Sequence, residues 1–205
     1  MSTRAASIQR GLSLEYFTVA WNLLEAAVAL VSGAVAGSIA LIGFGLDSLI
    51  EVSSGGVLLW RLQADHEAER RETVERIALK LVGGSLLLLA VYVAGDSVVS
   101  LVRREAPERS VPGIALAVAS LIAMPLLARA KRRVASELRS SALHADSRQT
   151  DICAYLSAIL LLGLLLNAAF GWWWADPAAG LVMAPLIACE GSKALQGKTC
   201  CQNCE

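Results

Sequence analysis

The chain has 205 residues, of which 56% are hydrophobic, and its mean hydropathy is +0.57. Its 18 basic and 18 acidic residues give zero formal net charge, which excludes the strongly basic surface of a typical nucleic-acid-binding protein. The apolar share exceeds that of an average soluble domain, and the charges gather between apolar runs, so the composition indicates a multi-pass protein of a lipid bilayer.

The chain contains six apolar runs of membrane-spanning length, because a bilayer core about 30 Å thick needs roughly 20 apolar residues of helix. The first 15 residues show no short apolar core with a small-residue cleavage site, so we expect no removable signal peptide. We expect an all-α, six-transmembrane-helix bundle over residues 16–192, a cytoplasmic N-terminus at 1–15, a cytoplasmic Cys-rich tail at 193–205 and no soluble C-terminal domain. The spans lie near residues 16–35, 38–60, 77–102, 111–130, 142–170 and 175–192, so the first two form a tight hairpin.

The distribution of Lys and Arg predicts the orientation of the chain. In a six-span arrangement, fifteen of the 18 basic residues fall on the side of the two termini, and only Arg103, Arg104 and Arg109 fall on the other side. Cytoplasmic segments carry the excess of Lys and Arg, so both termini are expected in the cytoplasm, and a bacterial inner membrane is the expected location. The Trp172–Trp174 run then lies at the outer interface, where indole rings are enriched.

The second span carries two acids, Asp47 and Glu51, about 40° apart on one face of a helix. Counted from Ser38, they lie about 14 and 20 Å deep, where one charge costs roughly 2.5–3.5 kcal/mol. Two like charges this close repel each other unless a cation or protons join them, and a divalent metal ion does so. The alternative is a pair of helix-end carboxylates solvated at an interface.

The fifth span offers two faces for metal ligands. On a helical wheel, Asp146, Gln149 and Cys153 fall within about 60° of each other, whereas His144 and Asp151 share the opposite face. A Cys thiolate is a strong ligand for a borderline-soft ion such as zinc, and an amide is a weak oxygen donor. Spacing alone leaves both faces open, and it leaves open that Cys153 is a small buried apolar residue.

Two further acids, Glu25 and Asp96, lie in the first and third spans. Each is a candidate proton-relay group, and each is equally explained as a neutral acid hydrogen-bonded between helices.

The C-terminal tail contains Cys200, Cys201 and Cys204. This C-C-x-x-C arrangement is either a partial metal-capture site or part of a disordered terminus whose cysteines are candidates for palmitoylation.

No motif of an enzyme is recognisable. The sequence has no P-loop and no G-x-G-x-x-G, and its two histidines, His66 and His144, form no H-E-x-x-H. We therefore expect a protein that is not an enzyme.

Three stretches together resemble the cation diffusion facilitator family. "GSIALIGFGLDSLIE" resembles its second helix, whose D-x-x-x-D falls on Asp47 and Glu51, and "WWWADPAAGLVMAPLI" resembles its sixth. "ALHADSRQTDICAYLS" resembles the fifth helix of the family. Gln149 stands where the family has a His or Asp, and Cys153 stands where it has an Asp four residues later. With its short tail, the chain resembles the small branch of the family that lacks the cytoplasmic domain and includes the synaptic-vesicle zinc efflux protein.

The resemblance implies a dimeric exporter of divalent transition-metal ions that exchanges them for protons by alternating access. The implied ligands of the transported ion are Asp47, Glu51, Gln149 and Cys153, with Asp146 or water replacing Gln149 where the amide does not bind. A thiolate favours zinc or cadmium over magnesium and calcium, so zinc is the expected substrate, with cadmium or cobalt as alternatives. The alternative function is a metal-binding accessory or sensor membrane protein that does not transport.

Overall fold

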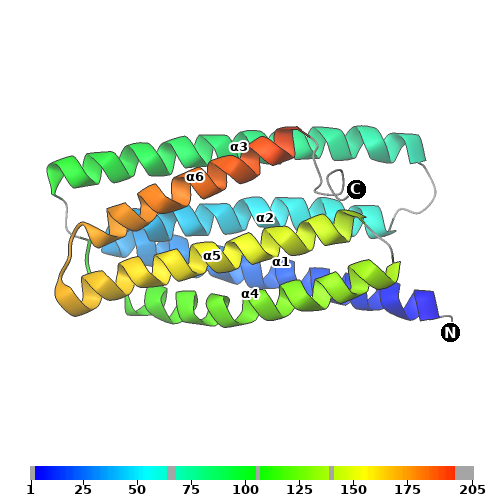
Figure 1. Ribbon diagram of the computed structural model, residues 1–205, viewed down its shortest axis with the longest axis horizontal. Helices are drawn as coiled ribbons and strands as arrows, with labels where there is room; N and C mark the ends of the chain where they lie inside the picture. The colour runs from blue at the N-terminus through cyan, green and yellow to red at the C-terminus, as the bar shows by residue number, and fades with distance from the viewer. Residues whose placement is uncertain (1–2, 64–67, 105–106, 139–140, 197–205) are drawn as a thin grey trace, which may run out of the picture.

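The computed structural model describes residues 3–63, 68–104, 107–138 and 141–196, and it forms six α-helices there. All six helices are long and apolar enough to cross a membrane, which confirms the expected all-α bundle of six spans (Figure 1). The helices are α1 (Thr3–Ala36), α2 (Ile39–Gln63), α3 (Ala68–Arg103), α4 (Val111–Leu138), α5 (Ser141–Phe170) and α6 (Ala175–Leu195).

Several helices extend beyond the apolar runs that predicted them. Helix α1 begins at Thr3 rather than near residue 16, α3 begins at Ala68 rather than near 77, and α4 ends at Leu138 rather than near 130. The added segments, such as "AERRETVERI" at the start of α3, are rich in Ala, Glu and Arg, which favour helix in water as well as in lipid. The apolar run therefore marks the part of the helix that lies in the membrane rather than the ends of the helix.

The helices pack mainly as three pairs, α1 with α2, α4 with α5, and α3 with α6, and α1 also packs on α4. Figure 1 shows α3 and α6 along one edge of the elongated bundle, with α2 between them and the α1–α4–α5 group. The connections α1–α2, α3–α4 and α5–α6 lie at one end of the bundle, and the first residues of α1 and the last residues of α6 lie toward the other, which we call the side of the termini (Figure 1).

The turn between α1 and α2 is short because Gly37 adopts a φ of 67°, a left-handed conformation that glycine reaches without steric penalty. The start of α2 is then capped from another helix. The carboxylate of Asp176, in the first turn of α6, accepts hydrogen bonds from the backbone N–H of Ile39 at 3.0 Å and from the Ser38 hydroxyl at 2.5 Å. These contacts fix the relative position of α2 and α6 at the end opposite the termini.

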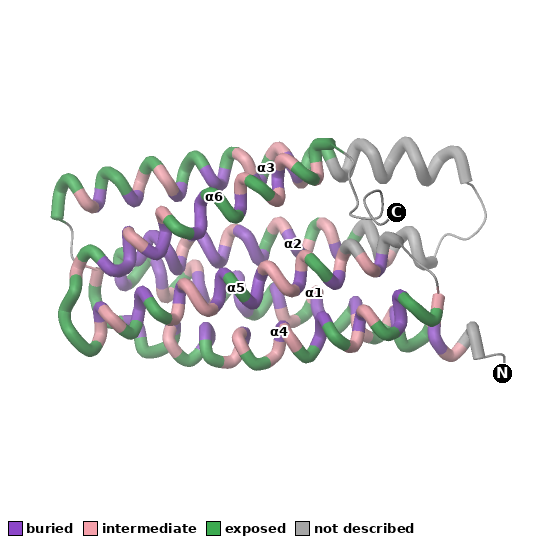
Figure 2. The backbone as a smooth tube through the Cα atoms, viewed as in Figure 1, coloured by how far each residue is buried: buried purple, intermediate pink, exposed green. Residues whose placement is uncertain are grey.

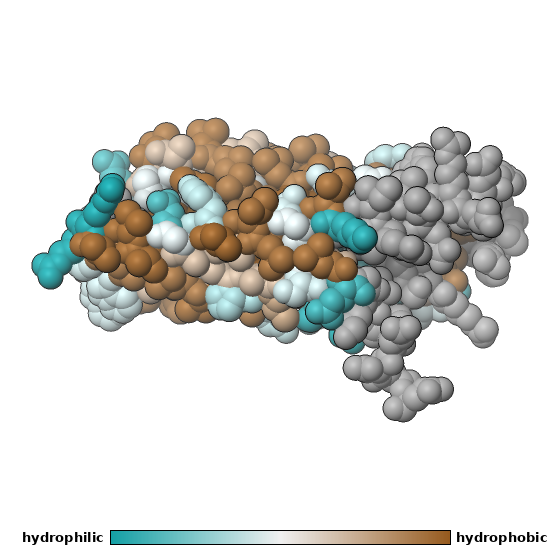
Figure 3. Space-filling view, turned by 90° about the horizontal axis from the view of Figure 1, so that it is seen from above, coloured by the Kyte–Doolittle hydropathy of each residue, from teal (hydrophilic) through white to brown (hydrophobic). Residues whose placement is uncertain are grey.

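The exposed surface of the bundle is apolar, as expected for a surface in contact with lipid. Val35, Leu88 and Val102 are each exposed by more than 70%. Figure 2 shows the buried residues concentrated on the faces between helices, and Figure 3 shows a largely hydrophobic surface with hydrophilic residues near both ends of the described part. Within the bundle the core is built from Leu, Ala, Met and the buried ring of Phe44.

Candidate metal site

Asp47 and Glu51 both point into the bundle from α2, with 6% and 8% of their surface exposed. They are therefore enclosed by other helices, and they are not solvated carboxylates at a helix end. Asp47 lies near the carboxylates of Glu25 on α1 and Glu190 on α6. Glu190 is an acid that we did not single out in the sequence, because it lies close to the end of the last span.

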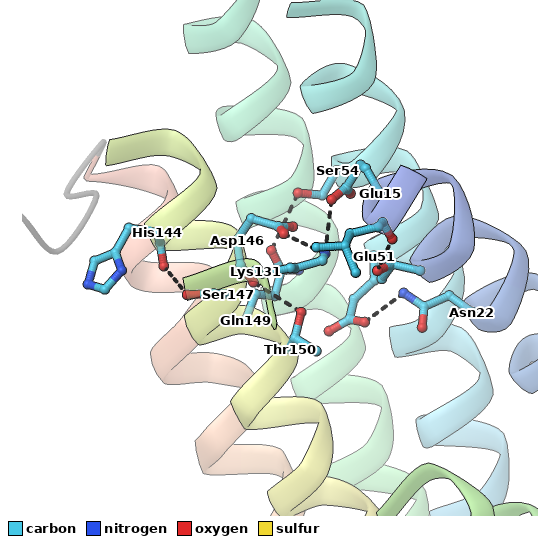
Figure 4. A network of polar contacts seen from close by, with 12 residues as sticks. Glu15, Asn22, Glu51, Ser54, Lys131, His144, Asp146, Ser147, Gln149 and Thr150 are labelled. Atoms are coloured by element: carbon cyan, nitrogen blue, oxygen red, sulfur yellow. Dashed lines mark hydrogen bonds and ion pairs between the residues drawn. The ribbon is translucent and has the colours of Figure 1, made fainter. Parts of the chain in front are cut away.

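Glu51 has partners on both α1 and α5. One carboxylate oxygen, Oε2, accepts a hydrogen bond of 2.8 Å from the side-chain amide of Asn22 (Figure 4). The side chain of Cys153, which is completely buried, lies close to the same carboxylate. The structure therefore brings Glu51 and Cys153 together across the α2–α5 interface, with Asp47 and Glu25 as the nearest other acids.

Gln149 lies one helical turn before Cys153 on α5, and its side-chain oxygen accepts a hydrogen bond of 3.4 Å from Ser54 on α2. This contact lies on the side of Glu51 toward the termini. Gln149 therefore contacts α2 through Ser54. None of the contacts that the structure describes joins Gln149 to Asp47 or Glu51.

An ion network, which we call the Lys131 triad, joins Lys131 of α4 to Glu15 of α1 and Asp146 of α5. The Lys131 ammonium, with 0% of its surface exposed, lies 2.9 Å from Glu15 and 2.5 Å from Asp146. In the sequence, Lys131 contributed only to the count of basic residues on the side of the termini. Its spacing of three residues from both of the buried residues Ala128 and Val134 is the signal that it faces inward.

The opposite face of α5 lies away from this network. Asp151 forms an ion pair with Arg132 of α4, and both side chains are about one-third exposed. Figure 4 shows the imidazole of His144 pointing away from the network, while its backbone carbonyl accepts a hydrogen bond from Ser147. Of the two α5 faces that the sequence left open, the one with Asp146, Gln149 and Cys153 is turned toward α2 and α4.

Glu25 is held by donors from three helices. Its carboxylate accepts hydrogen bonds from Trp21 on its own helix at 2.6 Å, from Ser48 on α2 at 3.3 Å and from Ser120 on α4. Asp96, on α3, lies beside the hydroxyl of Tyr92 one turn earlier. The contacts described for Asp96 do not connect it to the surroundings of Glu51.

In the ranges that the structure describes, no three His, Cys, Asp or Glu side chains converge closely enough to form a metal-holding group. Cys200, Cys201 and Cys204 lie outside the described residues. Asp47, Glu51 and Cys153 are therefore neighbours across two helices in this conformation rather than an assembled coordination shell.

Comparison with known proteins relates the chain to membrane transporters. It is 26% identical over 177 residues to an uncharacterized transporter of Methanocaldococcus jannaschii, covering 83% of this chain and 62% of that protein. It is 26% identical over 191 residues to transmembrane protein 163 of Xenopus laevis, covering 91% of this chain and 66% of that protein. A match of 31% identity over 109 residues to a cation-efflux pump of Shewanella oneidensis covers 53% of this chain and 33% of the pump.

The chain spans about two thirds or less of the length of these relatives. The family comparison also covers most of the chain: residues 16–195, which include almost all of the six described helices, match the cation efflux transmembrane domain. Six membrane helices with paired acids buried on α2 agree with this match. The chain therefore belongs to the cation efflux family, a family of divalent-cation transporters rather than enzymes.

Proposed function

We propose that this protein exports a divalent transition-metal ion, zinc in the first place and cadmium or cobalt as alternatives, from the cytoplasm in exchange for protons. The observation that carries the proposal is the burial of Asp47 and Glu51 on α2 opposite the thiol of Cys153 on α5. Two carboxylates and one thiolate match the ligand preference of zinc and cadmium better than that of magnesium or calcium. The names of two relatives, a transporter and a cation-efflux pump, support the transport function.

The exchange for protons follows from the chemistry of these ligands. Carboxylates and thiolates bind a metal ion only when they are deprotonated, so protons and the metal compete for the same atoms. Asp47, Glu51 and Cys153 take the ion from the cytoplasmic side, and protons arriving from the other side release it. The bundle alternates between two conformations, of which each opens the site to one side only.

Contacts on the side of the termini are suited to close the cytoplasmic path. The hydrogen bond between Ser54 and Gln149 joins α2 to α5, and the Lys131 triad joins α1, α4 and α5. Both lie between Glu51 and the end of the bundle that carries the termini, where they hold together helices that surround the proposed site. We assign the described conformation to the state that is closed toward the cytoplasm.

The proposed setting is a bacterial inner membrane with both termini in the cytoplasm and two copies of the chain forming a homodimer. The asymmetric distribution of basic residues supports the orientation. The role of the tail cysteines, Cys200, Cys201 and Cys204, as a metal-capture segment remains a proposal based on sequence alone.

Zinc uptake into proteoliposomes across an imposed pH gradient tests the function. We expect uptake by the unmodified protein, and a loss of more than about tenfold in Asp47→Ala, Glu51→Ala and Cys153→Ala, since each removes a ligand. Gln149→Ala is expected to keep more activity than these three. Asp151→Asn, on the other face of α5, serves as a control and is expected to transport normally.

Two outcomes would contradict the proposal. Zinc binding without flux in the unmodified protein would favour the metal-binding accessory or sensor function. Normal transport by Cys153→Ala together with loss in Asp151→Asn would move the site to the face of His144 and Asp151.

A further inference from the structure

Asn22 is an almost completely buried polar residue of α1, with 1% of its surface exposed, and it lies directly against Glu51. Its amide nitrogen donates the hydrogen bond of 2.8 Å to Glu51 Oε2 (Figure 4). Its amide oxygen, Oδ1, is buried and has no hydrogen-bond partner. Buried polar atoms in folded proteins are almost always paired, so an unpaired carbonyl oxygen beside a candidate metal ligand points to a partner that binds there.

The chemistry of the amide fits a cation as that partner. An amide oxygen carries two lone pairs and is a neutral oxygen donor, and the terminal torsion of Asn is broad and roughly two-fold. A half-turn about this torsion exchanges the nitrogen and the oxygen. The –NH2 group therefore suits the empty state, in which it donates to Glu51, whereas Oδ1 suits the loaded state, in which Glu51 binds the ion.

We propose that Asn22 is a ligand of the transported cation, contributed by α1 through Oδ1, beside Asp47, Glu51 and Cys153. This inference rests on the proposed function and adds a residue to its site. Gln149 is held one turn away by Ser54, so Asn22 takes the fourth position that the sequence had given to Gln149. Cation binding then connects three helices, because Asn22 lies on α1, Glu51 on α2 and Cys153 on α5.

The alternative role for Asn22 is to orient Glu51 through the –NH2 group alone. Direct ligation predicts that a different ligand atom placed at position 22 appears in the spectrum of the bound metal. A purely orienting role predicts no such signal. The test therefore adds a sulfur at this position and observes whether the metal detects it.

The experiment uses the full chain in detergent and Co2+ as the probe, whose thiolate charge-transfer band reports bound sulfur. The background protein keeps only Cys153 and carries four substitutions: Cys189→Ser, Cys200→Ser, Cys201→Ser and Cys204→Ser. In this background, Asn22→Cys is expected to raise the band per bound Co2+ roughly twofold, because a second thiolate joins the first. An unchanged band in Asn22→Cys, with Co2+ still bound, overturns the inference and leaves the proposed function in place.

A second variant covers the case in which Asn22→Cys does not fold. Asn22→Leu has a similar shape and no polar atoms, and it is expected to weaken Zn2+ binding by at least about tenfold. Asn167→Leu is the matched control: Asn167 is another buried Asn, it donates to the carbonyl of Pro107, and its substitution is expected to leave Zn2+ binding unchanged. Equal Zn2+ affinity in Asn22→Leu and the unmodified protein overturns the inference. Absence of Zn2+ and Co2+ binding in the unmodified protein overturns the proposed function as well.

Discussion

Glu25 illustrates how single buried acids are accommodated in this bundle. Hydrogen bonds from Trp21, Ser48 and Ser120 reach its carboxyl group from three helices. Such hydrogen bonds offset the cost of removing a carboxyl group from water. These contacts agree with an acid hydrogen-bonded between helices, and a proton-relay role for Glu25 or Asp96 stays a prediction.

Cys153 differs from Glu25 in its neighbours, because they are acids rather than donors. We expect Cys153→Asp to lower the preference for Cd2+ over Zn2+ by roughly tenfold, since a thiolate is the softer ligand and a carboxylate the harder one. Competitive binding of the two ions to the purified variant measures this ratio. Cys189→Ser removes an exposed cysteine of α6 and is expected to leave the ratio unchanged. A ratio in Cys153→Asp equal to that of the unmodified protein would show that the sulfur does not contact the ion.

At the scale of the helices, the Lys131 triad is a buried ionic connection among α1, α4 and α5. Lys131→Met leaves Glu15 and Asp146 without their counter-ion in a buried site, and breaking a buried pair in this way costs about 3–5 kcal/mol. We therefore expect a large loss of thermal stability in detergent for Lys131→Met.

The neighbouring residue provides the control for this prediction. Arg132→Met removes the ion pair with Asp151, whose side chains are partly exposed, and such pairs contribute only about 0–1 kcal/mol. Thermal unfolding of the two variants side by side measures the difference. Equal losses of stability would mean that the Lys131 triad adds no more than a surface ion pair.

Helices α3 and α6 approach each other closely at two glycines. A Cβ atom added to Gly191 would lie 2.9 Å from the carbonyl oxygen of Gly83, and one added to Gly83 would lie 2.8 Å from the carbonyl oxygen of Gly191. Small residues at such positions let membrane helices pack backbone to backbone. We expect Gly191→Ala to destabilise the α3–α6 pair by about 1–3 kcal/mol, as overpacking does.

Gly84→Ala is the matched control, because a Cβ atom at Gly84 would meet nothing within 4 Å. This control is expected to be neutral or stabilising by up to about 1 kcal/mol, since Ala favours helix more than Gly does. Thermal unfolding in detergent distinguishes the two variants. A Gly191→Ala protein as stable as Gly84→Ala would contradict the close backbone contact.

The sequence predicted the number and order of the helices because each one contains a long apolar run, and this pattern is local. It did not predict where α1 and α3 begin, because their polar ends are themselves good helix formers. The helical wheel grouped Asp146, Gln149 and Cys153 on one face of α5, but it did not decide between this face and the face of His144 and Asp151. It also did not predict the partners of Lys131 and Asn22, since a wheel gives the face of a helix and not the identity of the helix that packs on it.

For the whole molecule, the distribution of charge and the apolar surface together define how the bundle lies in a membrane. On the face seen in Figure 3, the most hydrophilic residues lie near the ends of the described part, and the surface between them is largely apolar. The first residues of α1 and the last residues of α6 lie toward the same end of the bundle (Figure 1). Lys131 is buried in an ion network, so we leave it out of the count of surface charges. The remaining Lys and Arg residues still number fourteen on the side of the termini and three on the other side.

We therefore expect the end with the termini to face the cytoplasm, since the bias of Lys and Arg sets the orientation of multi-pass proteins. A C-terminal fusion to green fluorescent protein, which matures in the cytoplasm, is expected to fluoresce in intact cells. A fusion to alkaline phosphatase after Arg109, in the connection between α3 and α4, is expected to be enzymatically active outside the cytoplasm. Phosphatase activity at the C-terminus and none after Arg109 would show the reverse orientation. Replacing Arg103, Arg104 and Arg109 with Gln is expected to leave both signals unchanged, because the other side already carries the dominant positive charge.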